Sequence, residues 1–342
     1  MRRIRLYFAP NVELEFTDRD IALRQIEEIA EKGTAFPVII YGPEGCGKTA
    51  LLRQAAEILD SYGYKTLFVS PLEGKLDRAL WFSPSIKDIV LQVLRTFNEP
   101  LSNLVRIAFE IEALLEKKFR RPKIALILDD LFQAVGLENA EKYVKTLLNI
   151  IEYPLEPYEN IVILVSSSEG ITRDRISRHN WARMYIMWNM SREGFQELYE
   201  KLPDSQQSFD NVWRWTGGNP RILRELYVAK WNIEEVLDRD IIRKRNLERF
   251  VASLSKEERN ILYESVHNPD YLWKNLAEPQ VQKLFQKLIE LNLIIEIWDR
   301  KQYLWIDTPP PECDPELGIG KYLAWQTPLH KEGVRIILER QC

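Results

Sequence analysis

Apolar residues follow two patterns along this chain, and the two patterns alternate. Short continuous apolar runs occur at residues 37–41, 124–128 and 161–165, and shorter runs predict strands at 65–70 and 184–188. Near-continuous runs are typical of parallel strands that are covered on both faces. Between them, apolar residues recur at i, i+3 and i+4, which predicts helices at 48–62, within 83–119 and around 143–151. The alternation predicts an α/β fold.

The first forty residues are less regular. Residues 1–8 alternate basic and apolar side chains, which predicts an edge strand or an arm. A helix is predicted to begin in the stretch from Phe16 to Asp20. Thr17 is its predicted cap, and Asp20, three residues later, is expected to bond back to it as in a capping box. Gly33 is expected to end this helix.

From residue 191 onward the pattern is mainly helical. Ser191 is predicted to cap one helix, the pair Gly217–Gly218 ends another, and Pro220 fits the first turn of the next. Ser255 and Glu258 form a capping box at the start of a new unit. Helices at 256–266, 271–277 and 278–292, followed by strands at 293–298 and 302–306, predict a winged helix-turn-helix. The predicted domains are therefore 1–190, a helical lid at 191–245, the winged helix at 246–311 and a tail at 312–342.

A glycine-rich loop follows the first core strand and fits the phosphate-loop pattern G-x-x-x-x-G-K-[ST]. Its glycines let the backbone turn and approach a polyphosphate, and its amides cradle anionic oxygens at the start of a helix. Lys48 is expected to reach the β- and γ-phosphates, and Thr49 to place its hydroxyl on Mg²⁺. A chance match is disfavoured because an apolar run precedes the loop and an amphipathic stretch follows it. The predicted nucleotide-binding residues are Gly42, Pro43, Glu44, Gly45, Cys46, Gly47, Lys48, Thr49 and Ala50.

Two later strands end in polar residues that face the same crevice. Asp129 is expected to hold Mg²⁺ through water, and Asp130 to act as the general base on the attacking water. The alternative is an ordinary strand followed by a turn-forming Asp pair. The strand at 161–165 runs into three serines, and Ser167 is a candidate to touch the γ-phosphate or the attacking water. A hydroxyl-rich turn explains these serines equally well.

Arginines supply further candidates. Residues 173, 175, 178 and 183 are all arginines, and one of them, with Arg183 as the candidate, is predicted to act as an arginine finger in a neighbouring subunit. The alternative is a solvated basic loop. Arg221 stands at a predicted helix start, where it would lean over the nucleotide, and the alternative is a surface arginine.

Composition narrows the setting. The chain has 342 residues, is 45% hydrophobic and 29% charged, and carries a formal net charge of −4, which argues against a protein coated with polyanions. Its three cysteines suggest no disulfide framework. We find no signal peptide and no apolar run long enough to span a bilayer, so we expect a cytoplasmic protein.

Together these residues resemble the archaeal ATPase family within the STAND and AAA+ branches of phosphate-loop NTPases. The resemblance rests on residues 16–20, the phosphate loop at 42–49, the Asp129–Asp130 strand end, the lid sequence at 217–221 and the winged helix. It implies a five-stranded parallel sheet with ATP and Mg²⁺ at the strand tips. It implies that Lys48 and Thr49 bind phosphate and metal, and that Asp129 and Asp130 take the metal-holding and catalytic roles. Arg221 then falls at the lid position called sensor 2, while STAND members often use the proline, here Pro220.

The sequence leaves three functions open. They are an ATP-driven switch that moves between ATP and ADP states, a DNA-acting ATPase like the replication initiators, and a scaffold that holds nucleotide with little hydrolysis. The absence of an Asn-Lys-x-Asp motif favours ATP over GTP. Residues 246–311 carry a formal charge of −2, and the presumed recognition helix offers only Lys283 and Lys287 as cations. Because DNA-binding domains are usually basic, the charge favours a protein partner, and a homo-oligomer remains possible.

Overall fold

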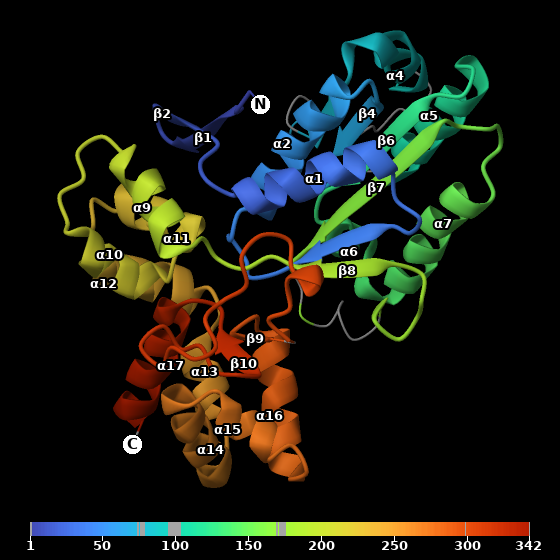
Figure 1. Ribbon diagram of the computed structural model, residues 1–342. Coiled ribbons are helices and arrows are strands. Elements are labelled where there is room, and N and C mark those ends of the chain that lie inside the picture. Colours follow the sequence, from blue (N-terminus) through green and yellow to red (C-terminus); the bar gives the residue numbers. More distant parts are fainter. Residues whose placement is uncertain are drawn as a thin grey trace. The chain divides into compact units, whose positions relative to one another are not determined.

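The computed structural model describes residues 2–73, 75, 79–94, 104–168, 170, 176–297 and 299–341 (Figure 1). The chain divides into two compact units. The first comprises Met1–Ile4, Asp20–Tyr41 and Lys48–Ile186, and the second comprises Arg5–Arg19, Gly42–Gly47 and Met187–Cys342. Residues 42–47, which link a strand of the first unit to its following helix, therefore group with the carboxy-terminal half of the chain. Among the described residues, no helix is both long and apolar enough to cross a membrane.

A six-stranded sheet forms the centre of the first unit, in the order β5-β4-β6-β7-β3-β8. Five neighbouring strands run parallel, which confirms the expected five-stranded parallel sheet. They are β3 (Val38–Tyr41), β4 (Lys65–Val69), β6 (Lys123–Leu128), β7 (Asn160–Ser167) and β8 (Arg183–Ile186). The edge strand β5 (Leu80–Phe82) is antiparallel to β4 and was not predicted.

Helices cover both faces of this sheet, because successive strand residues point to opposite faces. One face carries a buried cluster that joins alternate strand residues, such as Leu126 and Leu128, to the helices α4 to α7. The other face is contacted by α1 and α2, and Figure 1 shows α1 in front of the sheet. The helices are α1 (Asp20–Lys32), α2 (Lys48–Ser61), α4 (Lys87–Leu94), α5 (Leu104–Lys118), α6 (Leu131–Val135) and α7 (Ala140–Glu152).

The first helix begins later than the sequence predicts. It starts at Asp20, and Thr17 does not cap it: the Thr17 hydroxyl donates instead to the carbonyl of Glu15, at 2.8 Å. Asp18 and Arg19 both have left-handed backbone conformations, with φ of 58° and 64°. These two residues therefore form a turn before the helix.

The second unit opens with a hairpin of β1 (Arg5–Ala9) and β2 (Val12–Glu15), so the predicted edge strand pairs with a second strand that we did not predict. The hairpin contributes Ala9 and Val12 to a core that contains Phe195, Tyr199 and Val212. This core lies among the helices α9 (Arg192–Glu200), α10 (Phe209–Thr216) and α11 (Pro220–Val228). Ser191 caps α9 as predicted, by accepting from the backbone N–H of Gly194 at 3.0 Å.

The chain then continues through short helical segments into a second helical group. These segments are α12 (Ile233–Val236), η4 (Leu237–Arg243), α13 (Leu247–Ala252), α14 (Lys256–His267), α15 (Asp270–Lys274) and α16 (Pro279–Glu290). The capping box of Ser255 and Glu258 is present at the start of α14. The three helices α14 to α16 match the three predicted for the winged helix, and β9 (Ile294–Glu296) follows them.

The predicted partner of that strand is wrong. Residues 302–304 form a short 3-10 turn, η5 (Gln302–Leu304), and β9 pairs antiparallel with β10 (Leu323–Trp325). The last helix, α17 (Pro328–Gln341), contacts α13, α14 and η4 (Figure 1). The described residues 312–341 of the predicted tail therefore complete the two-stranded sheet and cover the helices.

Candidate functional site

A buried carboxylate stands at the carboxyl end of β6. Asp129 is 2% exposed, and its backbone N–H donates to the carbonyl of Val69 at 2.8 Å. Its carboxylate accepts hydrogen bonds from three hydroxyls. Thr49 donates at 2.9 and 3.1 Å to the two oxygens, Ser70 at 3.2 Å and Ser166 at 2.6 Å. Residues at the ends of three parallel strands and at the start of α2 therefore converge on one acid.

The atoms of this group suit a magnesium ion. Mg²⁺ prefers hard oxygen ligands and is usually held by one or two protein groups together with substrate phosphates and water. The Thr49 hydroxyl keeps a lone pair for a metal while its proton is donated to Asp129. Thr49 and Asp129, the two residues predicted for the metal, thus lie within hydrogen-bonding distance of each other across 80 positions of sequence.

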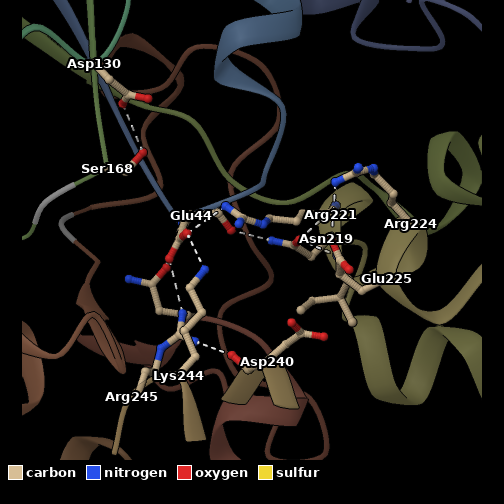
Figure 2. Close-up of polar contacts among 12 residues, drawn as sticks. Glu44, Asp130, Ser168, Asn219, Arg221, Arg224, Glu225, Asp240, Lys244 and Arg245 are labelled. Atoms are coloured by element: carbon tan, nitrogen blue, oxygen red, sulfur yellow. Dashed lines mark hydrogen bonds and ion pairs between the residues drawn. The ribbon is translucent and has the colours of Figure 1, made fainter. Parts of the chain in front are cut away.

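The neighbouring Asp130 has a different environment. Its backbone is left-handed, with φ of 48°, and its N–H donates to the Ser166 hydroxyl at 2.9 Å. The Ser168 hydroxyl donates to the Asp130 carboxylate over a long 3.5 Å, as Figure 2 shows. Non-glycine residues in this backbone region cluster at functional sites, where the surrounding structure holds them. Asp130 is half-buried just after the strand end, whereas Asp129 is buried.

The predicted serine run begins within β7, at Ser166 and Ser167, and the contact of Ser167 with the γ-phosphate stays a prediction. Ser167 is buried and lies opposite Tyr41 in the sheet register, while its two neighbours contact the acids. Ser70, Ser166 and Ser168 are thus polar residues of this site that sequence reasoning did not single out. The signal was present, because Ser70 also directly follows a core strand and strand ends of a parallel sheet meet at one edge.

The other predicted residues of the first unit are placed as follows. Lys48 is the first residue of α2 and is buried, and Ala50 is half-buried in the same turn. Arg183 is exposed at the amino end of β8, opposite Val38 at the start of β3. Asp129 follows the carboxyl end of a parallel strand, so Arg183 lies at the opposite, amino ends of the strands. Its role as an arginine finger stays a prediction. Arg173 and Arg175 lie outside the described residues.

Within the second unit, three cations surround one residue of the phosphate loop (Figure 2). The Glu44 carboxylate lies 2.7 Å from the Arg221 guanidinium, 3.2 Å from that of Arg245 and 3.5 Å from the ammonium of Lys244. Burial raises the pKa of Glu44, but the three cations outweigh burial and hold its pKa below the ordinary value. Glu44 is therefore a charged, multiply paired carboxylate at neutral pH.

The backbone of Glu44 is held as well. Its N–H donates to the Gln326 side-chain oxygen at 2.9 Å, and its carbonyl accepts from the Asn219 amide at 3.0 Å. The Asn219 amide also donates to the Asn189 side chain at 2.8 Å, and Asn189 donates to the carbonyl of Gln326 at 3.0 Å. These bonds close a ring of four residues. Asn189, Asn219 and Gln326 are all buried.

Close backbone approaches explain two glycines of the loop. A Cβ on Gly42 would lie 2.0 Å from the carbonyl oxygen of Met187, and Gly45, with φ of 80°, would place one 2.3 Å from the Arg221 Cβ. The N–H of Arg221 also donates to the Gly45 carbonyl at 3.3 Å. The start of α11 is therefore packed directly against the phosphate loop.

The residues just before Arg221 form the start of α11. Pro220 lies in the first turn of α11, as predicted, and Asn219 caps that helix by accepting from the N–H groups of Arg221 and Ile222 at 3.1 Å. Asn219 contacts the loop and was missed, although it stands beside Pro220. Its signal was an amide before a proline at a helix start.

A buried arginine also reaches the loop. Arg19 is 3% exposed, and its guanidinium donates to the Asp307 carboxylate at 2.6 Å and to the carbonyls of Cys46 and Trp188 at 2.7 and 3.0 Å. Cys46 is buried too, with its thiol 3.6 Å from the carbonyl of Met187. Sequence reasoning quoted Arg19 as part of a motif but assigned it no role.

The parallel sheet, the phosphate-loop motif that follows β3 and the paired acids after β6 define a nucleotide-binding protein of the phosphate-loop class. A family model described as "ATPase domain predominantly from Archaea" matches residues 16–226, more than half of the chain, and the chain belongs to this family. A comparison with curated proteins found no match.

Solved structures give weaker likenesses. The ORC2 protein of Aeropyrum pernix, described with ADPNP and ADP, has a TM-score of 0.44 and 12% identity over 97% of each chain. The ORC1 protein of the same organism, described in complex with DNA, has a TM-score of 0.40 and 13% identity over 95% of this chain and 93% of that one. The Cdc6p structure from Pyrobaculum aerophilum has a TM-score of 0.38 and 12% identity over 99% of each chain.

Proposed function

We propose that this protein is a molecular switch that binds ATP with Mg²⁺ and hydrolyses it to ADP and phosphate. The observation that carries the proposal is the hydrogen bond between Thr49 and Asp129, at 2.9 Å. It joins the end of the phosphate-loop motif to the acid of another strand, as a shared magnesium site requires. The ion, when bound, neutralises charge on the phosphates.

The residues of the chain take distinct roles in this proposal. Lys48 binds the β- and γ-phosphates, and the amides of residues 42–50 cradle them. Asp130 accepts the proton of the attacking water, while Ser168 orients its carboxylate. Ser166 bridges the two acids, since its hydroxyl contacts both the Asp129 carboxylate and the Asp130 N–H.

The switch part of the proposal is supported by the partners of Glu44. This loop residue is bonded to Asn219 at the start of α11 and to Gln326, which follows β10. A change at the loop therefore has direct hydrogen-bonded and ion-paired routes to the lid helices and to the carboxy-terminal segment. We propose that the nucleotide state is transmitted along these bonds.

We further propose that the winged-helix region binds a protein partner in preference to DNA. The guanidinium of Arg300 is used internally, since it donates to the carbonyls of Pro311, Glu312, Gly320 and Lys321. Lys283 pairs with Glu258 at 3.4 Å, and Lys301 with Asp299 at 3.1 Å. Few cations are left to displace counterions from a duplex.

Three variants test the ATPase assignment by calorimetry and phosphate release. Lys48→Ala is expected to weaken ATP binding strongly, whereas the exposed control Lys117→Ala is not. Asp130→Asn is expected to bind ATP and stop turnover, and Asp129→Asn to need more Mg²⁺, while the exposed control Asp88→Asn leaves both unchanged. Wild-type turnover in Asp130→Asn would rule out the general base, and unchanged ATP affinity in Lys48→Ala would rule out the phosphate-loop assignment.

A further inference from the structure

The three cations that surround Glu44 are not equivalent. The side chain of Arg245 is 11% exposed, and it also donates to the carbonyl of Asp240 at 2.9 Å. The side chains of Arg221 and Lys244 are 44% and 47% exposed. Arg245 is therefore fixed in place, whereas Arg221 and Lys244 can leave Glu44 without breaking a packed core.

Charge is also unbalanced at this place. One carboxylate faces three cations, and the nearby acids are engaged by other arginines: Glu225 pairs with Arg224 and Arg239, and Asp240 pairs with Arg239. A cluster with excess positive charge beside a phosphate-binding loop attracts further negative charge. The terminal phosphate of a nucleotide is the group that the loop would bring there.

We propose that Glu44 limits the preference of this site for ATP over ADP, because its carboxylate competes with the terminal phosphate for Arg221. In this structure Arg221 binds Glu44 (Figure 2). When ATP is bound, the Arg221 guanidinium moves from the Glu44 carboxylate to the γ-phosphate, while Arg245 keeps Glu44 in place. ADP has no γ-phosphate, so Arg221 stays on Glu44.

The position of Arg221 beside the phosphate loop supports this exchange. The backbone of Arg221 is already held against the loop, since its N–H donates to the Gly45 carbonyl and its Cβ lies beside Gly45. Glu44 thus acts as an internal competitor, and the inference rests on the nucleotide site proposed above.

The test is the ratio of dissociation constants for ADP and ATP, measured by calorimetry with Mg²⁺ on the full chain. Glu44→Gln removes the competing charge and keeps the size and an acceptor oxygen. We expect the ADP-to-ATP ratio to rise about 2–5-fold, the range that a half-exposed ion pair allows. The matched control is Glu225→Gln, which removes a carboxylate from the same helix as Arg221 without touching the loop, and it should leave the ratio unchanged.

A second variant separates competition from loop positioning. Arg221→Ala alone should lower the ratio, and in the Glu44→Gln background it should cancel the gain. An unchanged ratio in Glu44→Gln, or an equal weakening of both nucleotides, would overturn the inference, because Glu44 would then only position the loop. If wild-type protein binds ATP and Lys48→Ala does not, such a result leaves the proposed function standing. Failure of the wild-type protein to bind ATP would refute both the inference about Glu44 and the proposed function.

Discussion

The ion pair between Arg19 and Asp307 offers a quantitative test of how the second unit is held together. The two side chains are 3% and 7% exposed and their charged atoms lie 2.6 Å apart. Asp307→Ala would leave a buried guanidinium without its counter-charge. Breaking a buried pair in this way costs roughly 3–5 kcal/mol. For a unit of this size, that corresponds to a fall in melting temperature of roughly 6–20 °C.

Variants of both partners separate charge from packing. Arg19→Met should also destabilise, because the carbonyls of Cys46 and Trp188 lose a donor, at about 1–3 kcal/mol each. The double variant should be less destabilised than the sum of the two single variants, since no buried charge is left unpaired.

The control is a pair in the same region that is exposed. Asp299→Ala breaks the pair between Asp299 and Lys301, whose side chains are 53% and 61% exposed, and it should change the melting temperature little because solvent screens the pair. The assay is thermal unfolding followed by circular dichroism at neutral pH. If Asp307→Ala lowers the melting temperature no more than Asp299→Ala does, the buried pair does not stabilise the second unit as argued.

Three further predictions follow from charges elsewhere. Burial, the charge of Glu116 and a hydrogen bond with it raise the pKa of Glu112 from 4.5 to about 9, so its contribution to stability is full below pH 4.5 and is lost as the pH rises toward 9. Glu112→Gln should therefore flatten the fall in melting temperature between about pH 6 and 9, and parallel curves for both proteins would contradict this. Duplex DNA should bind weakly, with a log–log salt slope no steeper than about −2.7 if Lys283, Lys287 and Lys301 are the available cations, and nanomolar binding at physiological salt would favour the initiator-like function. If Arg183 acts in trans, mixing Arg183→Ala with Lys48→Ala should restore turnover, and strictly concentration-independent turnover of the wild type would exclude it.

Short local patterns predicted most of the first unit and the phosphate loop, whose residues 42–47 group with the second unit. The phosphate loop, the acids after β6 and the five parallel strands were all predictable, because each depends on a short run of residues and on where strand ends meet. The start of α1 was not, since Asp18 and Arg19 adopt left-handed conformations and the Arg19 side chain reaches Asp307, far along the chain. Local sequence alone favours Thr17 as the helix cap, because it does not reveal the distant contact between Arg19 and Asp307.

Long-range pairing explains the other differences. The strand partner of β9 lies beyond a polar turn and a proline run, at Leu323–Trp325, whereas sequence patterns favour the nearest candidate. The partners of Glu44 come from three separate stretches, and no local pattern links Gln326 to residue 44. Buried polar networks depend on tertiary contacts of this kind, so they could not be predicted from the chain.

The contacts of Glu44 bear on where this ATPase domain ends. The family match stops at residue 226, yet Lys244, Arg245 and Gln326 all bind a residue inside its phosphate loop. A chain cut after residue 226 would keep every residue of the nucleotide-binding motif and lose these partners of its second variable position, Glu44. The stretch that the family model matches is therefore shorter than the structure that holds the phosphate loop in this protein. An insertion or fusion between residues 226 and 326 that displaced Lys244, Arg245 or Gln326 would alter the contacts of the phosphate loop.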